Sequence, residues 1–96
     1  MREYESLYVL RPDLENEQTQ DLINRFKEVV SNQGGEVLDV TEWGKRRLAY
    51  EINEYREGYY VIMKFKDDNN VTAELERLMR INDSVMRYLT TRVDEV

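Results

Sequence analysis

The segment YYVIMKFK, residues 59–66, has the clearest strand pattern in the chain. Its apolar side chains Val61, Met63 and Phe65 alternate with a second set that includes the charged Lys64. Because successive side chains of a strand point to opposite faces of a sheet, this alternation predicts a strand with one covered face. We expect Val61, Met63 and Phe65 to point toward helices.

On both sides of this strand, the spacing of apolar residues switches between the period of strands and that of helices. In chain order it predicts a strand at 2–11, a helix from about Asn16 to Gly34-Gly35, a strand at 36–52, a turn at 53–58, the strand at 59–66, a helix from Val71 to Arg80 and a strand at 85–93. Gly44 predicts a bulge in the long second strand, and Asn70 is the candidate N-cap of the second helix.

The order strand, helix, strand, strand, helix, strand predicts the fold class. It is typical of an α+β, ferredoxin-like split βαβ fold (βαββαβ), in which a four-stranded antiparallel sheet carries two helices on one face. Residues 1–96 are expected to form a single domain, since this is an ordinary length for one core.

With both helices on one face, the other face of the sheet is left open, and in this chain it is not very polar. By the alternation, we expect it to carry Tyr60, Ile62, Lys64, Leu7, Val9, Met86 and Tyr88. A contiguous apolar patch of this kind marks a partner surface. Scattered apolar residues are also ordinary on protein surfaces, so the residues alone leave both interpretations open.

The composition argues against catalysis. The chain has no Cys and no His, so it lacks the thiolate nucleophile, the common metal ligands and the usual general base. We therefore predict a protein that is not an enzyme, with no catalytic residues, no metal, no cofactor and no small-molecule substrate. The sequence also lacks an apolar run of membrane-spanning length and a secretory signal pattern, so we expect a cytoplasmic protein with no membrane partner.

The cations are segregated, although the net charge is −6. Lys45, Arg46 and Arg47 form the densest positive run, and the aromatic residues Trp43 and Tyr50 flank it. Cations beside aromatic rings suit RNA, because arginine pairs with phosphate and also stacks on bases. The same run on an edge strand would discourage aggregation between sheet edges. The residues alone do not separate these two roles.

Several pieces of sequence occur together in one order and spacing along the whole chain. They are Arg2-Glu3-Tyr4-Glu5, Arg11-Pro12-Asp13, the segment from Trp43 to Tyr50, Gly58-Tyr59-Tyr60, and Arg80-Ile81-Asn82-Asp83 with Val85 and Arg87. Together they resemble the bacterial small-subunit ribosomal protein S6 family. One position departs from the family pattern: Glu51 stands where members commonly have Pro, so the path of the strand at this point does not carry over.

The resemblance implies a ferredoxin-like, ribosome-associated protein that is a structural constituent of the small ribosomal subunit. It further implies binding to the central domain of 16S ribosomal RNA, jointly with a basic neighbour, the S18 ribosomal protein. Mapped onto this sequence, the implied RNA contacts are Arg2, Lys45, Arg46, Arg47, Arg80 and Arg87, with Tyr4 and Tyr50 as stacking or packing partners. A basic partner on the open face would explain how an acidic chain joins a polyanion.

Two other functions fit the same topology less well. An RNA-recognition motif, which binds single-stranded RNA, needs a cation, Gly and an aromatic residue at the start of its third strand. Gly58-Tyr59 fits this pattern, but Glu57 occupies the cation position, and Tyr60 and Val61 also depart from it. A phosphotransferase would need a glycine-rich loop before a helix, whereas residues 12–15 are acidic and lack glycine.

Overall fold

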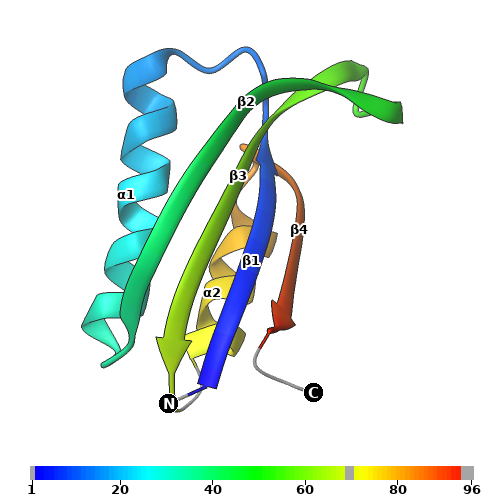
Figure 1. Ribbon diagram of the computed structural model, residues 1–96. Coiled ribbons are helices and arrows are strands. Elements are labelled where there is room, and N and C mark those ends of the chain that lie inside the picture. The colour runs from blue at the N-terminus through cyan, green and yellow to red at the C-terminus, as the bar shows by residue number, and fades with distance from the viewer. Residues whose placement is uncertain (1, 69–70, 94–96) are drawn as a thin grey trace.

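A single antiparallel sheet and two helices make up the computed structural model, which describes residues 2–68 and 71–93 (Figure 1). The elements are β1 (Arg2–Leu10), α1 (Asn16–Asn32), β2 (Glu36–Ile52), β3 (Tyr55–Asp67), α2 (Val71–Ile81) and β4 (Val85–Arg92). The strands lie in the order β2-β3-β1-β4, and every neighbouring pair is antiparallel. The predicted ferredoxin-like fold is confirmed.

Both helices cover the same face of the sheet, and the hydrophobic core lies between them and the strands (Figure 1). Val61, Met63 and Phe65 of β3 are fully buried there, as the alternation predicts. The rest of the core comes from both helices and β1: Tyr8, Leu10, Ile23, Phe26, Val30, Val71, Leu75 and Met79. Each helix contributes the side chains of one stripe, which is what amphipathic spacing dictates.

The helix ends follow local hydrogen bonding. The N-cap of α1 is Glu15, one residue before the expected position, and its backbone N–H donates to Oε1 of Gln18 at 3.0 Å. After α1, Gly34 takes a positive φ of 88°, as expected for a glycine that ends a helix. At the start of α2, the Val71 N–H donates to the buried Asp67 carboxylate at 3.2 Å. The predicted cap Asn70 lies outside the described residues.

The turn between β2 and β3 is shorter than predicted. Only Asn53 and Glu54 form it, with φ values of 48° and 72°, the positive values that a two-residue type I′ hairpin turn requires. The prediction of a turn at 53–58 is therefore wrong, because β3 already begins at Tyr55. Residues 56 and 57 are exposed strand residues, so no burial pattern marks them as part of a strand.

The β2–β3 hairpin extends past the rest of the sheet. The pairing of β1 with β3 ends at Leu10↔Tyr59, so residues 46–58 are paired only within the hairpin. Figure 1 shows this part curving over the end of β1 toward the side of β4. The predicted bulge at Gly44 is confirmed: the register skips a residue between Glu42 and Gly44, and Gly44 has a φ of 79°.

Candidate nucleic-acid and protein interface

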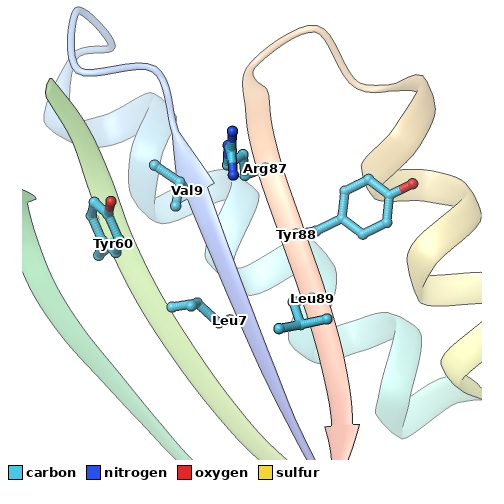
Figure 2. Close-up of a pocket in the computed structure, with 6 residues that line it drawn as sticks. All are labelled: Leu7, Val9, Tyr60, Arg87, Tyr88 and Leu89. Carbon is cyan, nitrogen blue, oxygen red and sulfur yellow. The ribbon is translucent and has the colours of Figure 1, made fainter. Parts of the chain in front are cut away.

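The open face of the sheet carries an apolar groove of about 440 Å³ (Figure 2). Its floor follows from the register, which places Leu7 between Ile62 and Leu89. In the next register row on this face, Val9 lies between Tyr60 and Arg87. Leu89, on the edge strand β4, is 58% exposed. The structure therefore gathers apolar side chains of β1, β3 and β4 into one concave surface.

One residue expected on the open face, Tyr88, borders the groove but directs its ring to the other side of the sheet. Tyr88 pairs with the fully buried Tyr8 and packs against the core, and Figure 2 shows its ring pointing away from the groove toward a helix. The cause is a bulge: Val9 pairs with Arg87, but Leu10 pairs with Val85. The register skips Met86, which is half-buried at the bulge, and this reverses the alternation of β4. Arg87 and Leu89 take the open-face positions instead.

The curled hairpin covers one end of the groove. Gly58 is buried so close to Val9 that a Cβ at this position would clash with the Val9 side chain and lie 3.5 Å from Leu48. This contact explains why Val9 is only 3% exposed although it belongs to the open face. Beyond it, the guanidinium carbon of Arg87 lies 4.7 Å from the ring centroid of Tyr50, within cation–π range. Hairpin and β4 thus meet above the groove.

A second set of stacked side chains lies beside the groove. The rings of Trp43 and Tyr60 stack with centroids 6.3 Å apart, and the guanidinium carbon of Arg46 lies 5.7 Å from the Trp43 centroid. Trp43 remains 47% exposed. The sequence already places Trp43 as an aromatic neighbour of the cation run, and Arg46 lies over its ring. Leu89 is not among the residues that the sequence places on the open face, because its position there depends on the bulge in β4.

The three consecutive cations divide between the two sides of the hairpin, as strand alternation requires. Arg46 faces Trp43, while Lys45 lies in a shallow hollow with Tyr59 and the segment that leads into α1. Arg47 lines another hollow near the hairpin tip, together with Tyr50. The hairpin therefore presents positive charge on both of its surfaces.

The other predicted RNA-binding residues do not all join this cluster. Arg80 is exposed in the last turn of α2, and α2 leads into the end of β4 that pairs with the end of β1, so Arg80 lies at the hairpin end of the molecule. Arg2 pairs with Asp67 at the opposite end of the sheet. The ring centroids of Tyr4 and Phe65 are 5.5 Å apart, and Tyr4 packs against the core. Of the stacking and packing roles expected for Tyr4, it therefore has the packing role.

Hydrogen bonds join the hairpin to α1 and to the loop before it. The Tyr55 hydroxyl donates to Asp13 at 3.0 Å, and this hydrogen bond raises the pKa of Tyr55. Desolvation acts to raise the pKa of the Asp13 carboxyl. The Tyr55 hydrogen bond and the charge of Arg11 outweigh it and hold this pKa below its usual value. Nearer the sheet, the Tyr59 hydroxyl donates to Glu42 at 2.6 Å, which raises the pKa of Tyr59 to about 12. Glu42 also accepts from Gln20 of α1 at 2.9 Å.

The departure at Glu51 falls within this hairpin. Glu51 lies 3.5 Å from Arg56, and both side chains are more than half exposed, so their ion pair is weak. Within residues 2–68 and 71–93, no three carboxylates come together in a way that could hold a metal ion. In the same residues, neither helix has the length and apolar character needed to cross a membrane.

Comparison with known proteins gives the family. Residues 3–92 match the family described as Ribosomal protein S6. The chain belongs to this family. It is similar to the small ribosomal subunit protein bS6 of Moorella thermoacetica, with 50% identity over 99% of the chain and 97% of the relative. The bS6 protein of Thermoanaerobacter pseudethanolicus is 52% identical over 99% of the chain and 100% of the relative.

A solved structure supports the same assignment. The crystal structure of the 30S ribosomal protein S6 from Thermotoga maritima is 31% identical and superposes with a TM-score of 0.91, covering 96% of this chain and 87% of that one. The S6 family is a structural, non-enzymatic component of the bacterial small ribosomal subunit. Its members are cytoplasmic and associated with ribosomes, and the corresponding predictions for this chain are confirmed.

Proposed function

We propose that this S6-family chain binds the central domain of 16S ribosomal RNA jointly with the S18 ribosomal protein. The hairpin cations and Arg87 contact the RNA, and the open-face groove receives the protein. The observation that carries this proposal is the curl of the hairpin, which brings Tyr50 onto Arg87 at the end of the groove. A phosphate-binding surface and an apolar docking surface therefore lie side by side.

The RNA side of the proposal rests on how the cations are held. Arg46 lies against Trp43 and Arg87 against Tyr50, so both guanidinium groups are restrained on aromatic rings. A restrained arginine loses less conformational entropy when it pairs with phosphate. Lys45 and Arg47 add charge on the other side of the hairpin. Arg80 lies at the same end of the molecule, so RNA that crosses this end would meet several cations despite the negative net charge.

The protein side rests on shape and on charge. Leu7, Val9 and Leu89 line the groove, which is the apolar centre that a protein interface needs. At the other end of the open face, Lys64 lies in register between Glu5 and Asp39. Two carboxylates against one ammonium leave this end negative, which complements a basic partner such as S18.

The test compares two variants that lose the same charge from different places. Arg46→Ala with Arg47→Ala removes two hairpin cations, and Arg25→Ala with Lys27→Ala removes two cations of α1. Binding of central-domain RNA is measured with S18 present over a series of salt concentrations. We expect the hairpin variant to bind more weakly, with a salt dependence flatter by about one unit of slope for each phosphate that the variant no longer neutralises. The α1 variant should bind nearly as the parent chain does.

Equal weakening in the two variants would contradict the proposal, because it would show that net charge and not the hairpin governs binding. Circular dichroism melting serves as the control for folding, since all four residues lie on exposed or half-exposed positions. Single Arg2→Ala and Arg80→Ala variants in the same assay decide whether these outlying cations also contact the RNA.

A further inference from the structure

The tip of the β2–β3 hairpin is not fixed by its own ladder. Arg47 pairs with Glu57, and the next register pair is Ile52 with Tyr55. Residues 48–51 of β2 therefore face a single residue, Arg56, of β3. A regular two-stranded ladder would determine the direction of the tip, but an irregularity of this size does not. Contacts from outside the hairpin must then set where the tip lies.

Two such contacts hold the tip from different elements. On one flank, the Tyr55 hydroxyl donates to Oδ2 of Asp13 at 3.0 Å. Oδ1 of the same carboxylate accepts from Arg11 Nε at 3.1 Å, and the Arg11 backbone N–H donates to the Ser84 carbonyl oxygen at 2.9 Å. The carboxylate that receives Tyr55 is thus itself anchored to the turn before β4. On the other flank, the Tyr50 ring lies against the Arg87 guanidinium.

We propose that Tyr55 and Asp13 are positioning residues for RNA binding: their hydrogen bond holds the hairpin tip in the orientation in which its cations meet phosphate. This inference rests on the RNA-binding function proposed above. A free tip would have to be ordered during binding, and ordering a segment weakens affinity even when every contact is still made. Tyr55 acts in this way through the hairpin and not by touching RNA.

The first test is Tyr55→Phe, which removes one hydroxyl and no charge. We expect RNA affinity in the presence of S18 to fall about three- to tenfold, the effect of removing one hydrogen bond. The salt dependence should keep its slope, because the same phosphates are still neutralised. This separates positioning from contact, since we expect removal of the Arg46 and Arg47 side chains to flatten the slope.

Tyr59→Phe is the matched control on the same strand. It also removes a hydroxyl that donates to a carboxylate, that of Glu42 at 2.6 Å. At Tyr59, however, β3 is paired with β1 through Leu10 as well as with β2. The sheet already fixes the backbone there, so we expect RNA affinity close to that of the parent chain.

Asp13→Ala gives a test in which two explanations predict opposite signs. Electrostatics alone predicts tighter RNA binding, because a negative charge is removed. Positioning predicts weaker binding, and it predicts that adding Tyr55→Phe to Asp13→Ala has no further effect, since the hydrogen bond is already absent. Hydrogen exchange of the free chain should show faster exchange at residues 46–58 in each variant, with unchanged exchange in the core strands.

The possible outcomes separate this inference from the function on which it rests. If the Arg46 and Arg47 double variant weakens binding while Tyr55→Phe does not, the positioning role is refuted and the RNA-binding function stands. If neither weakens binding, the function itself fails. A flatter salt slope in Tyr55→Phe, equal weakening in Tyr59→Phe, or additive effects of Tyr55→Phe and Asp13→Ala would each overturn the positioning role.

Discussion

The two faces of this sheet are made by the same strands, but they end in opposite environments. On the helix face, Tyr8, Met63 and Phe65 have no exposed surface. On the open face, the neighbouring Leu7 and Ile62 are half-buried, and Leu89 is 58% exposed. The end of the open face beneath the curled hairpin, at Val9, is covered by the chain itself.

In this small ribosomal protein, one set of apolar residues stabilises the fold and a second set remains available for assembly. Burial of the helix face drives folding, because each large side chain removed from water stabilises the native state by about 1.5–3 kcal/mol. The open face keeps a comparable set of side chains in partial contact with water. Substitutions on the two faces should therefore separate loss of stability from loss of docking.

The largest effect is expected from Phe65→Ala on the helix face. Phe65 is fully buried and stacks with Tyr4, so its removal leaves a cavity and should lower the free energy of unfolding by about 3–5 kcal/mol. Its neighbour Lys64 lies on the open face and is exposed, so Lys64→Ala should change stability by less than about 0.5 kcal/mol. Urea denaturation measures both. Similar losses in the two variants would show that the faces are not distinct.

A smaller loss of stability is expected at the covered end of the open face. Gly58→Ala puts a methyl group into the Val9 side chain and should destabilise the chain by about 1–3 kcal/mol through overpacking. Val9→Ala removes the group that the new methyl would strike. If the hairpin lies on Val9 as described, the double variant loses less stability than the two single variants do together. Strict additivity would place the hairpin elsewhere.

Much of the fold could be predicted from the sequence, because buried side chains recur along the chain with the period of their strand or helix. The alternation at residues 59–66 and the helical spacing of Ile23, Phe26 and Val30 record which side chains face the core. The hairpin tip has no such periodic pattern of apolar residues. Arg56 and Glu57 are exposed on a two-stranded ribbon, so their polarity is the same as that of a turn, and the strand boundary was misplaced there.

The interface was harder to predict because it depends on irregularities. Strand parity correctly placed Leu7, Ile62 and Tyr60, which lie in regular ladders. It failed at Tyr88, because an inserted residue in β4 reverses the alternation and sequence does not reveal where a bulge lies. The meeting of Tyr50 with Arg87 joins residues far apart in the chain. Only the curl of the hairpin brings them together.

The smallest effect on stability, with a clear effect on docking, is expected from Leu89→Lys. Because Leu89 is 58% exposed, the change should alter the free energy of unfolding by less than about 0.5 kcal/mol. It places a positive charge in the groove proposed to receive a basic protein, so S18 affinity should fall about tenfold or more. Titration calorimetry with purified S18 measures this directly.

Ile81→Lys is the matched control for Leu89→Lys. Ile81 is 61% exposed, but it ends α2 and lies outside the open face, and a lysine there is compatible with the helix dipole. It adds the same charge and removes a similar apolar area from the surface. If the groove is the docking surface, Ile81→Lys leaves S18 affinity unchanged while Leu89→Lys lowers it. Equal S18 affinities in the two variants would show that the groove is not the docking surface. The exposed apolar residues of the open face would then be ordinary surface residues, and the two faces of the sheet would differ in burial alone.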